Sequence, residues 1–289
     1  MIKDKYGNKY YKLGLHIHST LSDGKKTPEQ IAEIYKNCGY DAIALTDHWN
    51  YGEACEINGM PVISGCEYNL GVAETIEGVM HIVGLGMKKD PMIEKDADRQ
   101  SVIDSIIAVG GIPVLAHPAW SLNSVDDAAR LHGFVATEIY NAVSEAHESL
   151  RPYSDYFVDL CANAGIYYGL LATDDAHFYD GSDSCRGFVM VRCDELEQNA
   201  LMDAIRRGDY YASQGPELTV DRQGNKLVID TSPCEYIGTI SNLSWARGRV
   251  LRESGATHLE YEFKEYEKWV RVEVCDKDGR KAWSNIFVK

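Results

Sequence analysis

The sequence lacks several features that would assign it to a common class of protein. It has no run of roughly 18 apolar residues, so it predicts no membrane-spanning helix. Its eight cysteines include no Cys-x-x-Cys pair, which argues against a zinc ribbon. The chain also begins without an apolar leader stretch. We therefore expect a cytoplasmic protein whose thiols are reduced and mostly buried.

Positive charge is also in short supply. Lys and Arg number 29 against 44 Asp and Glu, which gives a net charge of −15. Proteins that coat nucleic acid normally carry a basic surface, so this charge argues against nucleic acid as a partner. Phosphate-bearing substrates are not excluded, because bound metal ions can reverse the local field.

The usual nucleophile and phosphate-loop signatures are missing too. The chain has no Gly-x-Ser-x-Gly motif and no cysteine in a nucleophile motif. Gly84-Leu85-Gly86 lacks the Lys-Ser/Thr that would follow in a phosphate-binding loop. What is present is ordinary for a globular protein: 289 residues, 45% hydrophobic and 25% charged. This length predicts about two domains.

The first three quarters of the chain alternate short apolar runs with segments of helical period. Thr27-Pro28-Glu29-Gln30 predicts a helix that begins with a capping box and ends at Gly39. Further helices are expected at Pro91–Val109, Glu145–Ala164 and Glu195–Arg207. The expected strands are Leu13–Ile17, Asp41–Thr46, Pro61–Glu67, Met80–Leu85, Ile112–Ala116, Val135–Tyr140 and Tyr167–Ala172. This alternation favours an α/β fold with a parallel sheet covered by helices.

The pattern changes after Gln214-Gly215-Pro216, where helical periodicity ends. The strand-like segments that follow are Lys226–Asp230, Arg249–Arg252, His258–Phe263, Trp269–Cys275 and Trp283–Val288. Asp276-Lys277-Asp278-Gly279 predicts a hairpin turn. We therefore expect an α/β domain over residues 1–216 and a small antiparallel β-sandwich-like domain over 217–289.

Histidines are the most informative residues, because six of the nine lie on the expected strands or just beyond them. They are His16, His18, His48, His81, His117 and His177, with Glu67 and Asp175 among the carboxylates beside them. The C-terminal ends of strands in a parallel β/α barrel converge on one mouth. Imidazole and carboxylate together suit Zn²⁺, Mn²⁺ or Fe²⁺. The other three histidines fall in expected helices or in the tail and are interpreted as surface residues.

Several of these residues occur in short motifs that follow one another along the chain. The motifs are His16-Ile17-His18-Ser19, Asp23-Gly24, Thr46-Asp47-His48, Gly65-Cys66-Glu67, His81, His117-Pro118 and Asp175-Ala176-His177. In this order they resemble the PHP (polymerase and histidinol phosphatase) superfamily, over roughly residues 10–216. The resemblance implies a distorted seven-stranded (β/α)7 barrel with a metal cluster at its mouth. The segment 210–216 and the β tail resemble a bacterial subgroup of metal-dependent phosphoesterases.

The resemblance also implies two or three divalent metal ions (Zn, Mn or Fe) and their ligands. The first set is His16, His18, Glu67 and Asp175; the second is Glu67, His81 and His117, with Glu67 bridging; the third is Asp23, His48 and His177. A carboxylate at Asp23 favours Mn²⁺, Fe²⁺ or Mg²⁺ over Zn²⁺ at the third position. Asp23 also has a second interpretation as a plain turn residue, because Asp-Gly is a common turn pair.

Further polar residues are candidates for supporting roles. Asp174 is interpreted as an orienting or helix-capping group, and Asp47 as a residue that orients a ligand or bonds the first turn. Glu138 and Asn141 end the sixth expected strand, where they can support the site. Arg186 is a candidate for binding a phosphoryl oxygen, with a plain surface ion pair as the alternative.

The function implied by the resemblance is hydrolysis of phosphate esters by a metal-bridged hydroxide, with no protein nucleophile. The expected partner is a small phosphorylated substrate, no membrane contact is expected, and association of identical subunits is left open. One alternative is an amidohydrolase-type metal hydrolase that acts on C–N or C–O bonds, although such enzymes usually bridge their metals with a carboxylated lysine. Another alternative is a PHP module in nucleic-acid processing.

Overall fold

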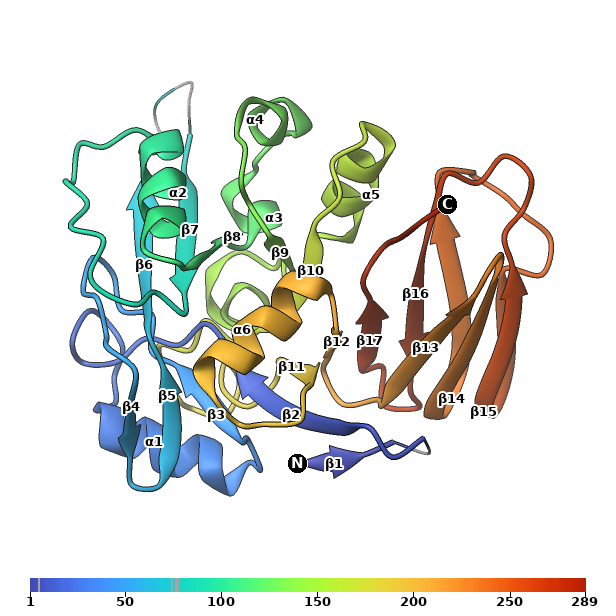
Figure 1. Ribbon diagram of the computed structural model, residues 1–289, viewed down its shortest axis with the longest axis horizontal. Coiled ribbons are helices and arrows are strands. Elements are labelled where there is room, and N and C mark those ends of the chain that lie inside the picture. Colours follow the sequence, from blue (N-terminus) through green and yellow to red (C-terminus); the bar gives the residue numbers. More distant parts are fainter. Residues whose placement is uncertain (5, 74, 76–77) are drawn as a thin grey trace.

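The protein, seen here as a computed structural model that describes residues 1–4, 6–73, 75 and 78–289, has a mixed α/β fold (Figure 1). Its described strands pair as a 13-stranded sheet and a 5-stranded sheet. The main path of the larger sheet runs β13-β14-β16-β17-β12-β11-β2-β3-β5-β4, and the smaller sheet runs β10-β9-β8-β7-β6.

The strands of the first three quarters are β1 (Ile2–Lys3), β2 (Lys9–Gly14), β3 (Ala42–Ala44), β4 (Cys55–Ile57), β5 (Met60–Ile63), β6 (Gly65–Leu70), β7 (Met80–Leu85), β8 (Ile112–Leu115), β9 (Ala136–Asn141), β10 (Gly169–Thr173), β11 (Phe188–Arg192) and β12 (Tyr210–Ser213). The tail contains β13 (Leu218–Gln223), β14 (Lys226–Ser241), β15 (Val250–Glu262), β16 (Trp269–Cys275), β17 (Lys281–Ser284) and β18 (Phe287–Val288). The helices are α1 (Pro28–Asn37), α2 (Arg99–Ala108), α3 (Pro118–Ser121), α4 (Val125–Arg130), the π-helix η1 (Ser144–Glu148), α5 (Asp155–Asn163) and α6 (Gln198–Arg207).

The pairing of the strands differs from the expected parallel sheet. Strands β2, β3 and β5 are parallel, as are β8, β9 and β10, but β7 is antiparallel to both β6 and β8. The segment expected as one strand over 61–67 divides at Ser64 into β5 and β6, which belong to different sheets. In the described part of the chain the strands therefore do not pair as one closed barrel. A short connection from β6 to β7 suits antiparallel pairing, whereas parallel neighbours need a long crossover.

Helix α1 begins as the sequence predicts. The Thr27 hydroxyl accepts a hydrogen bond from the Gln30 N–H (3.4 Å), and the Gln30 side chain accepts one from the Thr27 N–H (3.0 Å). The other expected helices are shorter in the structure. The expected helix over 91–109 is confined to α2, and the one over 145–164 is broken into η1 and α5. Pro152 lies in this break, where it cannot donate a helical hydrogen bond.

The tail forms antiparallel strands, and β16 has the expected bounds. The hairpin after it is confirmed, since the Gly279 N–H donates to the Asp276 carbonyl (3.1 Å). Strand β17 also pairs with β12, so the tail continues a sheet of the first three quarters. In Figure 1 the tail strands lie at one end of the molecule, on the side of α5. Arg271 of β16 is buried and binds Asp159 of α5 through two contacts of 2.7 and 3.0 Å. The division at residue 216 stays a prediction.

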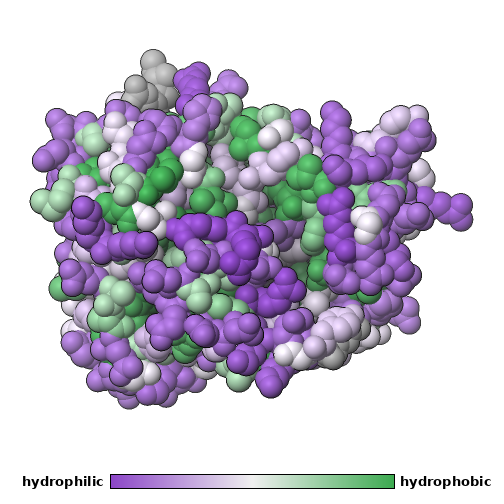
Figure 2. Space-filling model, in the orientation of Figure 1, coloured by the Kyte–Doolittle hydropathy of each residue, from purple (hydrophilic) through white to green (hydrophobic). Residues whose placement is uncertain are grey.

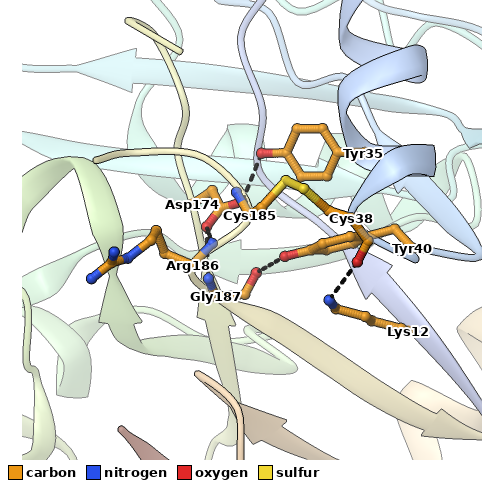
Figure 3. The surroundings of a disulfide bond; sticks show 8 residues. All are labelled: Lys12, Tyr35, Cys38, Tyr40, Asp174, Cys185, Arg186 and Gly187. Carbon is orange, nitrogen blue, oxygen red and sulfur yellow. Dashed lines mark hydrogen bonds between the residues drawn. A yellow bond between two sulfur atoms is a disulfide. The ribbon is translucent and has the colours of Figure 1, made fainter. Parts of the chain in front are cut away.

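One disulfide joins distant parts of the chain, so the expectation of reduced thiols is wrong for two of the eight cysteines. Cys38 at the end of α1 is bonded to Cys185, 147 residues later, in the segment between β10 and β11 (Figure 3). The spacing of the cysteines gave no signal for this pair, because the two meet only through the tertiary fold. The other six are free, and three of them, Cys66, Cys161 and Cys234, are buried as expected.

The surface has the mixed character of a charged globular protein. Hydrophilic residues cover most of the face seen in Figure 2, and apolar residues lie there in separate patches. None of the described helices combines the length and the hydropathy that a membrane crossing requires.

Candidate metal centre

All nine residues that the sequence nominates as metal ligands lie together in the structure. Their nitrogen and oxygen atoms form three groups, within each of which one atom per residue lies within 4.8 Å of the others. The groups are His16, His18, Glu67 and Asp175; Glu67, His81 and His117; and His18, Asp23, His48 and His177. Seven of the nine line one pocket of about 360 Å³, and the other two, His16 and His18, are buried.

The first group forms where the chain leaves β2 and β10. The Asp175 N–H donates to the His16 carbonyl (2.9 Å), and the His18 N–H donates to the Ala176 carbonyl (3.1 Å). These hydrogen bonds hold the two segments side by side just past their strands. As a result, the Nε2 atoms of His16 and His18 lie 3.2 and 3.1 Å from Asp175 Oδ1.

Glu67 is the common member of the first two groups. Its Oε2 lies 3.2 Å from His16 Nε2 and 3.1 Å from His18 Nε2. Its Oε1 lies 3.0 Å from His81 Nδ1 and 3.3 Å from His117 Nε2. One fully buried carboxylate therefore faces both sets of imidazoles, which is the position that a bridging ligand requires.

The third group surrounds Asp23. Oδ1 of Asp23 lies 3.4 Å from His177 Nε2, and Oδ2 lies 3.6 Å from His48 Nε2. His18 also belongs here, because its Nδ1 lies 3.6 Å from Asp23 Oδ1. The Asp23 side chain is 54% exposed, so this group opens toward solvent while the first is sealed.

Two of these residues have left-handed backbone conformations. His117 has φ 27° and Asp175 has φ 51°, values that residues other than glycine rarely adopt. They lie just past β8 and β10, where the turn brings each side chain into the pocket. Strain of this kind concentrates at functional sites, where the surrounding structure supports it.

Without a cation, the close carboxylates favour the protonated forms of His16 and His18. Burial alone would lower the pKa of His16, but the carboxylates of Asp175 and Glu67 outweigh it and raise the pKa well above its usual value. At His18 burial also acts to lower the pKa, but Asp175 and Glu67 outweigh it and raise the pKa to about 9. Burial alone would raise the pKa of Glu67, yet the imidazoles of His16 and His81 hold it well below its usual range.

Two buried atoms in the cluster have no hydrogen-bond partner, and both suit a metal ion. They are Asp175 Oδ1 and His48 Nδ1. An unpaired buried polar atom is costly and calls for an explanation such as an ion. Imidazole nitrogens and carboxylate oxygens that face one another are the donor set of Zn²⁺, Mn²⁺ and Fe²⁺ sites. The residues present therefore fit a metal cluster.

Two of the expected supporting residues, Glu138 and Asn141, contact the candidate ligands. Glu138 lies 2.6 Å from His16 Nδ1, and it accepts hydrogen bonds from the His117 N–H (2.9 Å) and from Asn141 (2.8 Å). Asn141 also donates to Asp175 Oδ2 (3.2 Å). Such partners fix the orientation and tautomer of a ligating imidazole.

Asp47 forms hydrogen bonds to the loop that carries Asp23. Its carboxylate accepts hydrogen bonds from the Ser19 N–H (2.8 Å) and from the hydroxyls of Ser19 and Ser22 (both 2.7 Å). The carboxylate thus bonds the turn after β2, and its role in orienting a ligand stays a prediction.

Asp174 holds the segment between β10 and β11. Its carboxylate accepts hydrogen bonds from the Tyr35 hydroxyl (2.7 Å) and from three consecutive N–H groups, those of residues 185–187 (2.7–2.8 Å) (Figure 3). Asp174 is buried, and this burial raises its pKa to about 6. It anchors the segment that presents Asp175 and His177 rather than capping a helix.

Arg186 is not brought to the metal pocket. Its N–H is committed to Asp174, and in Figure 3 its side chain extends away from that carboxylate. The side chain lines a separate hollow with Gln214 and Arg280. The phosphate contact expected of Arg186 therefore does not fit this geometry.

Other residues of the pocket were not nominated from the sequence as ligands or supporting residues, although the loop over 120–123 was expected to shape the pocket. Trp120 packs its ring against His117 (ring centroids 4.9 Å apart), and Phe178 stacks on His147 (4.0 Å). Lys25 lines the pocket near Asp23. Trp120 and Phe178 follow His117 and His177 by three residues and one, so proximity to a ligand motif was the only available signal.

The fold is mixed α/β and carries a His/carboxylate cluster that fits metal ions, and comparison with known proteins places the chain in a family. The PHP domain family model matches residues 14–161, just over half of the chain. The chain therefore belongs to the PHP domain family. The matched range contains seven of the nine candidate ligands; Asp175 and His177 follow it.

Two curated relatives match the chain over short stretches. DNA polymerase III subunit alpha of Treponema pallidum is 31% identical over 78 residues, which are 24% of this chain and 7% of that protein. Phosphoribosyl 1,2-cyclic phosphate 1,2-diphosphodiesterase of Eggerthella lenta is 36% identical over 81 residues, 26% of this chain and 30% of that protein. The chain thus spans less than a third of the length of either relative.

A solved structure matches the chain along its whole length. It is a two-domain protein containing a predicted PHP-like metal-dependent phosphoesterase from Bacteroides vulgatus, with a TM-score of 0.58 and 16% identity. The match covers 100% of this chain and 97% of that one, so the similarity of fold includes the β tail.

Proposed function

We propose that this protein is a metal-dependent phosphoesterase that hydrolyses phosphate esters at the His/Asp/Glu cluster. The observation that carries the proposal is Glu67, a buried carboxylate placed between two groups of imidazoles. Beside it lies Asp175 Oδ1, which is close to two imidazoles but forms no hydrogen bond. The proposed ligand sets are those expected from the sequence, with His18 shared between the first and third. The distorted seven-stranded barrel that the resemblance implies stays a proposal for residues 1–216, whose described strands pair in two sheets.

The metal ions would supply Lewis acidity, lowering the pKa of a water nucleophile and stabilising charge on the phosphoryl oxygens. The chain's own residues would orient the side chains that bind these ions. Glu138 fixes the ring of His16, and Asn141 fixes the carboxylate of Asp175. Ser144 lines the pocket, and its hydroxyl donates to Asn141 Oδ1 (2.8 Å) rather than to a base.

The proposal is tested with metal-analysed protein and a panel of phosphomonoesters, phosphodiesters and amides. We expect turnover of at least one class of phosphate ester, lost after chelation and restored by Mn²⁺, Fe²⁺ or Zn²⁺. Hydrolysis of amides with no phosphate ester cleaved would overturn the proposal in favour of an amidohydrolase-type enzyme.

Asp23→Ala tests the third metal position. A ligand at this place should cost one metal ion per chain and roughly ten- to a thousand-fold in turnover, with little change in fold. A turn residue should cost no more than about 1 kcal/mol of stability and leave turnover nearly intact. Metal content and kcat are measured together, with the exposed Asp126 on α4 replaced by alanine as the matched control. Wild-type values for both would leave a two-metal enzyme.

Metal affinity should depend steeply on pH. A metal ion must displace the proton that His18 holds when no metal is bound, and the pKa of His18 in that state is about 9. Protons compete less as the pH rises toward that value, so affinity should increase from pH 6 to pH 8.5, by roughly tenfold per pH unit for each proton displaced. Titration of chelator-treated protein with Mn²⁺ measures this slope. A Mn²⁺ affinity that stayed constant from pH 6 to pH 8.5 would contradict the view that His18 is protonated when no metal is bound.

A further inference from the structure

Lys25 occupies a position in the metal pocket that the metal cluster itself does not explain. Apart from histidines, it is the only basic residue among the described residues that line this pocket. The same pocket contains the carboxylates of Asp23, Glu67 and Asp175. A lysine near three carboxylates would ordinarily form an ion pair. Lys25 is exposed, and its ammonium has no partner in the described part of the chain.

The carboxylates are already engaged by imidazoles. Each oxygen of Asp23 faces a histidine, and both oxygens of Glu67 lie 3.0–3.3 Å from imidazole nitrogens. Bound metal ions would occupy the same oxygens. Lys25 is therefore left as a free cation at the rim of a pocket whose anions are committed.

The backbone around Lys25 is held in place. Its N–H donates to the His177 carbonyl (2.8 Å), which ties the residue to the segment after β10. The preceding Gly24 packs against the backbone of His18, and a Cβ at this position would lie only 2.2 Å from the His18 carbonyl oxygen. The Thr20 N–H closes the loop by donating to the Lys26 carbonyl (2.9 Å). The backbone of Lys25 is thus held beside the third group of ligands, which favours recognition without reordering of the loop.

We infer that the Lys25 ammonium binds a non-bridging oxygen of the substrate's phosphoryl group and gives the pocket a preference for phosphate monoesters over diesters. The inference rests on the proposed phosphoesterase function. A monoester is a dianion near neutral pH and gains more from an added cation than a singly charged diester does. Trp120 and Phe178 provide apolar walls on which the ester's leaving group can lie.

The chain offers a matched pair of variants. Lys25→Met removes the charge and keeps the length of the side chain, and Lys26→Met removes the same charge from a neighbour that does not line the pocket. The first measurement is calorimetric binding of inorganic phosphate to the metal-loaded protein, which requires no turnover. We expect Lys25→Met to weaken phosphate binding roughly ten- to a hundred-fold, as for loss of one charge-assisted hydrogen bond, with metal content and melting temperature unchanged. Lys26→Met should bind phosphate as the wild type does, and Lys25→Arg should recover most of the affinity.

The second measurement separates the two ester classes. For Lys25→Met, KM for p-nitrophenyl phosphate should rise by the same factor as the loss in phosphate affinity, whereas KM for bis(p-nitrophenyl) phosphate should change less than about threefold. Equal phosphate binding by wild type and Lys25→Met, or an equal loss in Lys26→Met, would overturn the role of Lys25. A wild-type protein that binds phosphate through Lys25 but cleaves no ester would refute the proposed hydrolysis instead.

Discussion

Glu67→Gln is expected to lower metal content and phosphoesterase turnover together, with turnover falling by roughly a hundred-fold or more. Glutamine keeps the size of the side chain but removes the negative charge between the imidazoles of His16 and His81. It also replaces one acceptor oxygen with an NH₂ group, which cannot ligate a cation. Metal analysis and kcat on the same preparation measure the effect.

The control for this variant is Glu56→Gln, which makes the same change at an exposed position on β4. It should match the wild type in both measurements. Full turnover in Glu67→Gln with all metal ions bound would show that the carboxylate does not bridge, and the first two ligand sets would have to be redrawn.

Asp174→Ala is expected to be the most destabilising change outside the ligand set. It would leave three backbone N–H groups and the Tyr35 hydroxyl without their acceptor in a buried place. Each buried donor left unpaired costs about 1–3 kcal/mol, so we expect the free energy of unfolding to fall by at least about 3 kcal/mol. Urea denaturation of the metal-loaded protein provides the measurement.

Asp180→Ala is the matched control in the same segment. Asp180 is half exposed and lies 3.2 Å from His147, and a pair of this kind is worth no more than about 1 kcal/mol. If Asp174→Ala unfolded within 1 kcal/mol of the wild type, water would have to satisfy the freed N–H groups. The segment between β10 and β11 would then not depend on this carboxylate.

Features governed by local sequence were predictable, and features governed by distant contacts were not. The capping box of α1 depends on residues three apart, and the bounds of β16 follow from its own apolar pattern. The division of the chain at Ser64 into two sheets was missed, because a continuous apolar run gives no sign of which sheet each half joins. The break between η1 and α5 was also missed, although Pro152 in this break is a local signal against a continuous helix.

The candidate site divides in the same way. His16 and His18 could be nominated because their spacing and their place after a strand are visible in the sequence. Lys25 could not be nominated in this way. Its proposed role depends on tertiary contacts, namely the hydrogen bond of its N–H to the His177 carbonyl and the engagement of the nearby carboxylates by histidines. Arg186 was nominated for its charge and its nearness to Asp175 in sequence. In the structure the Arg186 N–H donates to Asp174, and Arg186 lines a different pocket.

The bond between Cys38 and Cys185 turns much of the polypeptide into a closed covalent ring. A protease that cuts one loop inside the ring opens it without releasing a fragment, so the nicked molecule would separate into two pieces on a gel only after thiol is added. The ring contains six of the proposed ligands: His48, Glu67, His81, His117, Asp175 and His177. The other three, His16, His18 and Asp23, lie in the segment before Cys38. The ring and the free N-terminal arm each carry an incomplete set of ligands, and neither could assemble the metal cluster without the other.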